Sequence, residues 1–260
     1  MPTDDGWLMT DSSALRDVQY RTDANLAARQ SIYACQHPHQ DLQELVLGLA
    51  DLSGREAVAD IGCGNGAYLA ELGRRGFAGR VLGADLSAGM LAAARGRAAR
   101  AALITADAGA LPLRDGAADL TLAMHMLYHV PDPVPAIREL RRVTRPGGRV
   151  VVGLNGADHL RELRTIVAAA HGAWPGERIR LHDGEALLRT VFSSVTRHDF
   201  AGQLRIPDPE PVAAYVRSMS STLDHADPER IVADVLSAAF PAGSGRDLLV
   251  TTHAGCLVCR

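Results

Sequence analysis

VADIGCGNG, residues 58–66, is the stretch that decides the fold of this 260-residue chain. It begins as a short apolar run and ends in glycines at positions 62, 64 and 66. Such a run is typical of a buried strand that passes into a helix, and glycines let the backbone turn tightly and approach a ligand without collisions at Cβ. The stretch therefore predicts a strand, a ligand-binding turn and a helix, in that order.

Short apolar runs alternate with helical patterns downstream of this turn. Continuous apolar runs suit strands that are buried on both faces, and their alternation with helices predicts a parallel sheet. Right-handed crossovers then place the carboxyl ends of the strands along one edge, where ligands bind. The predicted strands of this part are Ala57–Ile61, Val81–Ala84, Ala102–Ile104, Leu120–Met124 and Val150–Leu154.

The regions on either side of this sheet are expected to be mainly helical. Residues 1–18 are interpreted as a poorly ordered lead-in, and two helices are expected between Asp23 and Leu52, separated at His37-Pro38. Beyond Asn155, the patterns predict helices over 159–170, 184–191, 207–220 and 228–240, and strands over 195–200 and 248–258.

These elements suggest a division of the chain. Residues 1–52 are expected to form the lead-in and cap helices, and residues 53–260 the main domain. Within it we expect a cofactor-binding half at 53–155, an acceptor-binding half with a helical lid at 156–246, and a terminal strand at 247–260.

Composition excludes several classes of function. The net charge is −3, every basic residue is arginine and no basic run is present, so nucleic acid is not expected as a partner. Without lysine, neither a P-loop nor a Schiff-base enzyme is possible. The chain has no run of about 18 apolar residues and no secretory pattern at its start, so we expect a cytoplasmic protein without membrane association.

The four cysteines do not read as a disulfide framework. Cys256 and Cys259 form a CxxC pair, but on a strand this odd spacing points the two side chains to opposite faces. Neither a disulfide nor a metal site is therefore expected.

Carboxylates follow the first three predicted strands of the sheet. Asp60 lies two residues before the first glycine, Asp85 ends the second strand and Asp107 follows the third. Asp85 is placed to accept both hydroxyls of a ribose, and Asp107 to accept a hydrogen bond from an adenine amino group. Asp85 also suits the N-cap of the next helix, for which Ser87 competes, and Asp107 equally suits the cap of a short helix.

Charge separates the two nucleotide cofactors that fit this pattern. A dinucleotide carries a pyrophosphate, which favours a helix N-terminus without nearby carboxylates. Asp60 would repel that group, and the third glycine comes one residue too early for GxGxxG. S-adenosylmethionine carries a sulfonium and an ammonium and no phosphate, so the sequence favours this methyl donor.

The motifs together resemble the class I S-adenosylmethionine-dependent methyltransferases, in particular the bacterial small-molecule enzymes related to ubiquinone/menaquinone-biosynthesis methyltransferases. The resemblance covers roughly residues 58–155. It rests on DIGCGNG at 60–66, GADLSAGML at 83–91, ADAGALPL at 106–113, ADLTLAMHMLYHVPD at 118–132 and ELRRVTRPGGRVV at 139–151.

The resemblance implies a Rossmann-like α/β fold with a seven-stranded, mostly parallel sheet and an antiparallel terminal strand. It implies S-adenosylmethionine as cofactor and S-adenosylhomocysteine as product. Met124 stands where the family more often has a polar residue. The cofactor-binding positions that it implies are Asp60, Gly62, Gly64, Gly66, Asp85, Leu86, Met90, Asp107 and Ala108, with Met124 and His125 at the end of the fourth strand.

Further side chains are candidates for catalysis and for binding of the methyl acceptor. His125 and His129 are candidate general bases, because an imidazole with a pKa of about 6.5 takes a proton at neutral pH, but either can also be structural. Tyr20, with Arg29 and Tyr33, either closes the cofactor pocket or packs the N-terminal helix on the sheet. Acceptor contacts are expected from Tyr128, His129, Asn155, His159 and Tyr215, although Asn155 also suits a helix cap and Tyr215 the core.

The function expected from the sequence is methyl transfer to a small-molecule acceptor by in-line displacement, with oxygen or nitrogen favoured over carbon as the methylated atom. Positioning of the two reactants is the main task of such an enzyme. Two alternatives remain at this point: an NAD(P)-dependent oxidoreductase, and a catalytically silent protein that binds S-adenosylmethionine. The sequence carries no signal for the oligomeric state.

Overall fold

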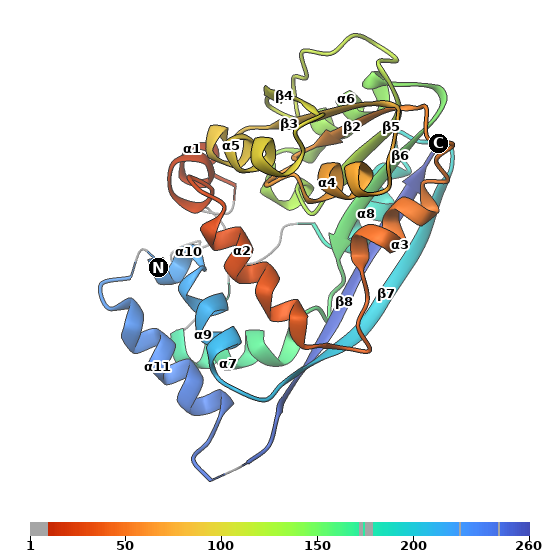
Figure 1. The fold of residues 1–260 in the computed structure, drawn as a ribbon. Coiled ribbons are helices and arrows are strands. Elements are labelled where there is room, and N and C mark those ends of the chain that lie inside the picture. The colour runs from red at the N-terminus through yellow and green to blue at the C-terminus, as the bar shows by residue number, and fades with distance from the viewer. Residues whose placement is uncertain (1–9, 172–173, 175–178, 224, 244) are drawn as a thin grey trace.

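The computed structural model describes residues 10–171, 174, 179–223, 225–243 and 245–260, and centres on one twisted sheet (Figure 1). The strand order is β1-β7-β8-β6-β5-β2-β3-β4. Strands β4, β3, β2, β5 and β6 run parallel, whereas β8 is antiparallel to both β6 and β7. The strands span Gln36–His37 (β1), Ala57–Ile61 (β2), Arg80–Asp85 (β3), Ala102–Thr105 (β4), Ala118–Met124 (β5), Thr144–Asn155 (β6), Val195–Ile206 (β7) and Leu248–Cys259 (β8).

Helices cover both faces of this sheet. Helices α3, α4 and α5 pack on one face, and α6 and α8 on the other. The helical elements are Ser12–Ala14 (α1), Leu15–Gln19 (η1), Ala24–Ser31 (α2), Ile32–Cys35 (η2), Leu42–Leu49 (α3), Ala67–Arg74 (α4), Ala88–Arg97 (α5), Leu127–His129 (η3), Pro133–Val143 (α6), Arg161–His171 (α7), Leu181–Leu188 (α8), Glu210–Arg217 (α9), Ser220–Leu223 (α10) and Pro228–Ala239 (α11).

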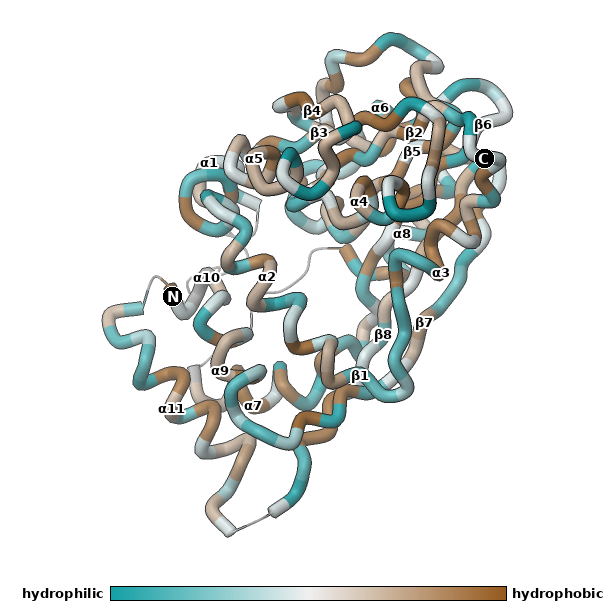
Figure 2. Tube along the Cα trace, viewed as in Figure 1, coloured by the Kyte–Doolittle hydropathy of each residue, from teal (hydrophilic) through white to brown (hydrophobic). Residues whose placement is uncertain are grey.

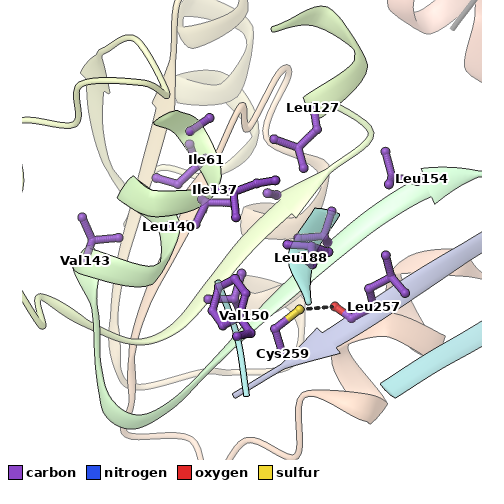
Figure 3. Close-up of a cluster of buried hydrophobic side chains, with 14 of the residues drawn as sticks. Ile61, Leu127, Ile137, Leu140, Val143, Val150, Leu154, Leu188, Leu257 and Cys259 are labelled. Carbon is purple, nitrogen blue, oxygen red and sulfur yellow. Dashed lines mark hydrogen bonds between the residues drawn. The ribbon is translucent and has the colours of Figure 1, made fainter. Parts of the chain in front are cut away.

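The sheet buries side chains on both faces, as continuous apolar strands require. On β5, Leu120 and Leu122 enter the cluster under α3 and α4, whereas Ala123 enters the cluster under α6 and α8. Figure 3 shows this second cluster, in which Cys259 lies. Cys256 belongs to the opposite cluster and all four cysteines are free thiols, so the prediction that the CxxC pair is split between faces is confirmed.

A separate apolar cluster joins the helices that follow β6 to the far ends of β7 and β8. It is formed by α7, α9 and α11 with the 3-10 turn η2, and the long strands β7 and β8 run down to it from the sheet (Figure 1). Hydrophobic and hydrophilic residues alternate along these helices, as amphipathic packing requires (Figure 2). Among the helices of the described residues, none has the length and apolarity needed to cross a membrane.

The structure differs from the sequence prediction at the N-terminal end. The predicted Rossmann-like sheet and its antiparallel last strand are confirmed, but an eighth strand, β1, pairs at the edge with β7. Residues 12–19 are helical although a poorly ordered lead-in was expected, because the Asp11 carboxylate accepts hydrogen bonds from the backbone of Ser13 and Ala14 and caps the first turn. Residues 1–9 of that prediction lie outside the described residues.

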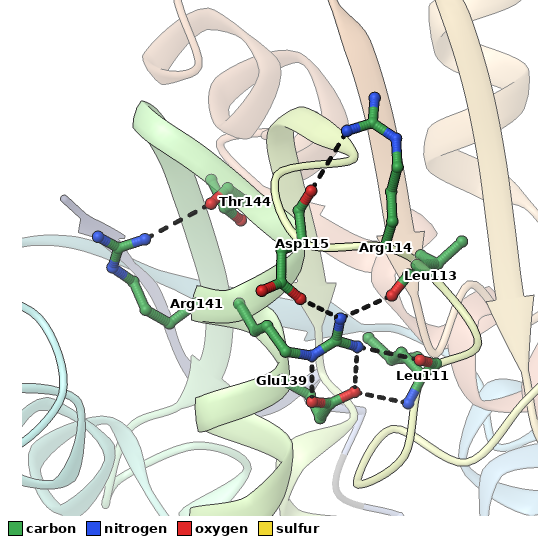
Figure 4. Close-up of polar contacts among 8 residues, drawn as sticks. Leu111, Leu113, Arg114, Asp115, Glu139, Arg141 and Thr144 are labelled. Atoms are coloured by element: carbon green, nitrogen blue, oxygen red, sulfur yellow. Dashed lines mark hydrogen bonds and ion pairs between the residues drawn. The ribbon is translucent and has the colours of Figure 1, made fainter.

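The loop between β4 and β5 is fastened to α6 by one guanidinium group. Arg142 donates hydrogen bonds to the carboxylate of Glu139, to Asp115 and to the carbonyl oxygens of Leu111 and Leu113 (Figure 4). The Glu139 carboxylate oxygen that accepts from Arg142 Nη2 also accepts the backbone N–H of Leu111, at 2.7 Å. The loop at the carboxyl end of β4 is thereby held in one position at the edge where ligands bind.

Candidate active site

The glycine loop between β2 and α4 forms the floor of the site. Gly62, Gly64 and Gly66 have φ angles of 69°, 54° and 78°, a region in which other residues are strained. A Cβ added at Gly62 would lie 2.7 Å from Cβ of Met126, and one at Gly66 would lie 2.9 Å from Cβ of Ala94. Glycine is therefore required both for the turn and for the close approach of neighbouring elements.

Asp60 presents a buried carboxylate directly before this loop. The residue is 1% exposed, and neither of its carboxylate oxygens has a hydrogen-bond partner in the described part of the chain. Burial, with the nearby charge of Asp85, raises the pKa of Asp60 to about 7. A buried acceptor without a partner is unfavourable on its own, so this position is suited to a ligand that brings a positively charged donor.

Asp85 ends β3 and braces the glycine loop. One carboxylate oxygen accepts the backbone N–H of Gly64 at 2.8 Å, and the other accepts that of Ser87 at 2.8 Å. Burial raises the pKa of Asp85 in spite of these hydrogen bonds. Ser87, and not Asp85, is the N-cap of α5, because its hydroxyl accepts the backbone N–H of Met90. Of the two candidate caps, the structure selects Ser87.

The ends of β3 and β4 supply the remaining predicted cofactor contacts. Asp107 is exposed, and one carboxylate oxygen accepts the backbone N–H of Gly109 at 2.7 Å, so it does cap a short turn. Met90 is fully buried, whereas Leu86 and Ala108 are partly exposed. Leu86, Met90, Asp107 and Ala108 all line the cavity that Asp60 and the glycine loop also line.

This cavity has a volume of about 680 Å³ and lies at the carboxyl ends of the parallel strands. It receives side chains from the N-terminal segment, from η3 and from α9 as well as from the strand ends. The predicted site residues that line it are Tyr20, Asp60, Gly62, Gly64, Asp85, Leu86, Met90, Asp107, Ala108, Met124, His125, Tyr128, His129, Asn155, His159 and Tyr215. Gly66 is the one predicted position outside the lining; it starts α4 instead.

Met124 is the last residue of β5, and His125 follows it directly. The backbone of His125 has φ 53°, which is rare for a residue with a side chain, and its N–H donates to the carbonyl of Gly153 at 2.9 Å. Strain of this kind is often found at functional sites. Burial lowers the pKa of His125 to about 4, so the imidazole is neutral at neutral pH.

His129 is paired with a tyrosine from the N-terminal segment. Its Nε2 atom lies 2.9 Å from the Tyr20 hydroxyl, and the two rings meet edge to face at 5.4 Å. The ring of Tyr128 also packs against that of His129, with centroids 4.5 Å apart. The backbone carbonyl of Tyr20 accepts the Ser87 hydroxyl at 2.7 Å, so Tyr20 links η3 to the end of β3 across the cavity.

His159, after β6, makes a second tyrosine–histidine pair. Its Nδ1 atom accepts the backbone N–H of His253 at 3.1 Å, so Nε2 carries the proton and donates to the Tyr33 hydroxyl at 2.8 Å. Burial, with other nearby charges, lowers the pKa of His159 to about 3. A neutral His159 whose two ring nitrogens both make hydrogen bonds positions Tyr33 rather than transferring a proton.

Tyr215, on α9, both packs in the core and lines the cavity; the sequence had offered these as alternatives. It is 9% exposed and belongs to the apolar cluster of α7, α9 and α11, yet it also lines the cavity. Its ring stacks on that of Trp174 with centroids 6.2 Å apart. The helical region after β6 therefore closes one side of the cavity with aromatic rings.

Two cavity residues carry unsatisfied polar atoms that the sequence did not reveal: Tyr68, which was not selected as a site residue, and Arg29, for which the sequence left open pocket closure or packing. The Tyr68 hydroxyl, on α4, is buried and has no hydrogen-bond partner among the described residues; burial, with the charge of Asp60, raises its pKa. Arg29, on α2, has one buried terminal nitrogen without a hydrogen bond. The sequence offered one signal for Tyr68 as a site residue: it is a polar aromatic residue in the first turn after the glycine loop.

Comparison with known proteins agrees with this arrangement. A family model described as a methyltransferase domain matches residues 59–152, from β2 to β6. The chain is 30% identical over 221 residues to a malonyl-[acyl-carrier protein] O-methyltransferase of Serratia marcescens, a match that covers 80% of this chain and 82% of that protein. The match therefore extends well beyond the cofactor-binding half.

Other similarities cover less or show the fold alone. An uncharacterized protein of a Streptomyces fradiae transposon is 38% identical over 115 residues, but the match spans 43% of this chain and 33% of that protein. A Haemonchus contortus phosphoethanolamine N-methyltransferase, solved with S-adenosylhomocysteine, superposes with a TM-score of 0.59 at 18% identity, covering 96% of this chain and 59% of that one.

Proposed function

Because this chain belongs to the class I S-adenosylmethionine-dependent methyltransferases, we propose that it methylates an oxygen or nitrogen atom of a small-molecule acceptor bound beside Tyr20 and His129. S-adenosylmethionine supplies an electrophilic methyl group on a sulfonium that leaves as a neutral thioether. The observation that carries the proposal is the buried, unpaired carboxylate of Asp60 beside the glycine loop.

In this proposal, Asp60 accepts a hydrogen bond from the ammonium of the cofactor, and the raised pKa of Asp60 falls when that cation binds. Asp85 and Asp107 accept hydrogen bonds from the ribose and the adenine, while Leu86, Met90 and Ala108 pack against the adenosine. Residues 53–155 thus hold the cofactor, and residues 156–246, with the helices before residue 53, hold the acceptor. Holding two reactants in line is worth up to about 7–11 kcal/mol of the barrier.

Of the two candidate bases, the geometry favours His129. An imidazole with the pKa of His125, about 4, is a weak proton acceptor at neutral pH. His129 is held by Tyr20 at 2.9 Å, at the boundary of the strand ends and the helical region. In this geometry the Tyr20 hydroxyl takes the acceptor's proton as it gives its own to Nε2 of His129, and His125 shapes the pocket.

The partners follow from the same features. The net charge of −3 without a basic run supports a small molecule over a nucleic acid as acceptor. Four free thiols support a reducing compartment such as the cytoplasm. The acceptors named for the relatives differ: malonyl groups on a carrier protein, and demethylmenaquinone in two actinobacterial relatives. A panel of acceptors is therefore needed.

Calorimetry with S-adenosylhomocysteine, NADH and NADPH tests the cofactor. We expect micromolar or tighter binding of S-adenosylhomocysteine and none of either dinucleotide; the reverse result would make the protein an oxidoreductase. A second assay follows formation of S-adenosylhomocysteine with phenols, carboxylic acids and amines as acceptors. Binding without turnover on any of them or in a cell extract would leave a catalytically silent cofactor-binding protein.

A further inference from the structure

Tyr68 places a buried hydroxyl in the wall of the cavity, and no other residue in the described ranges forms a hydrogen bond with it. The residue lies in the first turn of α4, shortly after Gly66, and is 8% exposed. A buried hydroxyl that has lost its hydrogen bonds to water without replacing them costs free energy, so such groups are nearly always paired. The Tyr68 hydroxyl is therefore suited to a partner that a ligand brings.

Asp60 lies on the same face of the sheet as Tyr68. Side chains alternate between the two faces along a strand, and Val58 of β2 enters the cluster under α3 and α4, whereas Ala59 enters the opposite cluster. The side chain of Asp60 therefore points toward α3 and α4. Tyr68 packs in this same cluster, together with Leu122, the residue of β5 that is paired in register with Asp60.

The carboxylate of Asp60 and the hydroxyl of Tyr68 are neighbours that do not bond to each other. Neither oxygen of Asp60 accepts a hydrogen bond from Tyr68, although a phenol and a carboxylate readily form one. Their proximity agrees with the pKa of Tyr68, which burial raises and the charge of Asp60 raises further. An acceptor without a donor thus lies beside a donor without an acceptor, and both residues line the same cavity.

These two unpaired groups match the two charged groups of an amino acid. An ammonium only donates hydrogen bonds, a carboxylate only accepts them, and both are attached to the same carbon atom. In the proposed function Asp60 accepts from the ammonium of the cofactor, so a hydroxyl beside Asp60 is placed to meet the carboxylate. A hydrogen bond from a hydroxyl to a carboxylate is roughly twice as strong as one between neutral groups.

We propose that the Tyr68 hydroxyl donates a hydrogen bond to the carboxylate of the cofactor's amino acid moiety, while Asp60 binds the ammonium. This inference rests on the proposed function, because it takes the ammonium to lie at Asp60. Tyr68 is then a specificity-determining residue that favours S-adenosylmethionine and S-adenosylhomocysteine over adenosine thioethers without a carboxylate. Phenylalanine in its place keeps the aromatic packing in the cluster and loses only this contact.

Calorimetry with three adenosine thioethers on the full-length protein tests this assignment. S-adenosylhomocysteine carries both charged groups, 5′-deoxy-5′-(3-aminopropylthio)adenosine lacks the carboxylate, and 5′-methylthioadenosine lacks both. From the usual strength of a hydrogen bond to a charged group, Tyr68→Phe is expected to weaken binding of S-adenosylhomocysteine by roughly 10- to 100-fold. The affinities of the other two thioethers are expected to change by less than about threefold, because neither has a carboxylate to lose.

Two further variants assign the effect to the carboxylate. Asp60→Asn is expected to weaken S-adenosylhomocysteine and the aminopropyl thioether alike, because both carry the ammonium. Thr222→Val removes another buried hydroxyl that is unpaired within the described structure but lies outside the cavity lining, and it is expected to change no affinity. Tyr68→Phe breaks no hydrogen bond of the folded chain, so it is expected to fold, and thermal unfolding of each variant verifies this.

Three results would overturn the inference. The first is that the wild type binds the aminopropyl thioether as tightly as S-adenosylhomocysteine, so that the carboxylate contributes nothing. The second is that Tyr68→Phe binds S-adenosylhomocysteine as tightly as the wild type. The third is that Tyr68→Phe weakens both ligands equally, which would place the hydroxyl on the ammonium or on Asp60. Failure of the wild type to bind S-adenosylhomocysteine would instead contradict the proposed function.

Discussion

The two ends of the cavity differ in the way the chain builds them. The cofactor end consists of carboxylates and glycines at the carboxyl ends of adjacent parallel strands, so each lies within the last residues of a predicted strand or a few residues after it. The acceptor end is assembled from four separate segments. They contribute Tyr20 before the sheet, Tyr128 and His129 on η3, His159 after β6 and Tyr215 on α9.

This difference shows which part of a binding site depends on local sequence. At the cofactor end, the position of Asp60 is fixed by the strand it ends and by the loop that must follow. At the acceptor end, the Tyr20–His129 and Tyr33–His159 pairs join residues more than 100 positions apart. Substitutions at the first end are therefore expected to change cofactor affinity, and substitutions at the second end to change acceptor binding and turnover.

The largest effect is expected from Gly62→Ala at the cofactor end. The added Cβ would lie 2.7 Å from that of Met126, on a backbone with φ 69°. Strain and overpacking together should lower the free energy of unfolding by about 2–5 kcal/mol and abolish binding of S-adenosylhomocysteine. Chemical denaturation and calorimetry measure the two effects.

Gly73→Ala is the matched control for this substitution. Gly73 lies inside α4 with nothing within 4 Å of an added Cβ, so alanine should raise the free energy of unfolding by up to about 1 kcal/mol. Equal stability of the Gly62→Ala and Gly73→Ala variants would show that the loop tolerates a side chain and does not approach its neighbours as described.

A smaller effect of opposite sign is expected from Asp60→Asn in the cofactor-free protein. The pKa of Asp60 is about 7 in the folded chain against 3.8 for an unperturbed Asp, so between these values the folded chain binds more protons than the unfolded chain. The contribution of Asp60 to stability therefore falls as pH rises from about 4 to about 7. Asn does not titrate, so the variant should gain about 1–3 kcal/mol relative to wild type over this range.

Denaturant unfolding of both proteins at pH 5, 6, 7 and 8 measures this difference. It should grow with pH and level off above pH 7. A difference that is independent of pH would mean that Asp60 is ionised throughout and already has a partner.

The smallest effect on stability is expected at the acceptor end, from the pair of Tyr20 and His129. A neutral hydrogen bond of 2.9 Å contributes about 0.5–1.5 kcal/mol. A double-mutant cycle of Tyr20→Phe and His129→Asn, followed by thermal unfolding, should give a coupling of about this size. Binding of S-adenosylhomocysteine should change less than threefold in His129→Asn, whereas methyl transfer should fall by about 10²-fold or more. Unchanged turnover would remove His129 from proton transfer.

The contrast between local and long-range determinants also explains how much of the fold the sequence predicts. Apolar runs and glycines predict β2, β3, β5 and the terminal strand β8 within a few residues, because a buried parallel strand and a tight turn both restrict residue type locally. The predicted pair of helices between Asp23 and Leu52, interrupted at His37-Pro38, is also found as α2 and α3. The two-residue edge strand β1 is missed because two residues carry no periodicity.

At the site, the sequence predicts which positions face the cavity better than it predicts their partners. Ser87 and Asp85 compete as caps in the sequence, and only the folded backbone shows that Asp85 braces Gly64 instead. Whether the buried Nη2 atom of Arg29 finds a hydrogen-bond partner depends on the side chains that distant segments bring near it, which no local pattern encodes. The same holds for the neutral state of His159, which follows from a hydrogen bond with the distant backbone of His253.

The most direct test of the central claim compares S-adenosylhomocysteine with 5′-methylthioadenosine, which lacks the ammonium, on wild type and Asp60→Asn at pH 8. At this pH the carboxylate of Asp60 is ionised. The wild type should prefer S-adenosylhomocysteine, and Asp60→Asn should reduce that preference by roughly 10- to 100-fold without weakening 5′-methylthioadenosine. An equal loss for both ligands, or no loss for either, would contradict the assignment of Asp60 to the ammonium.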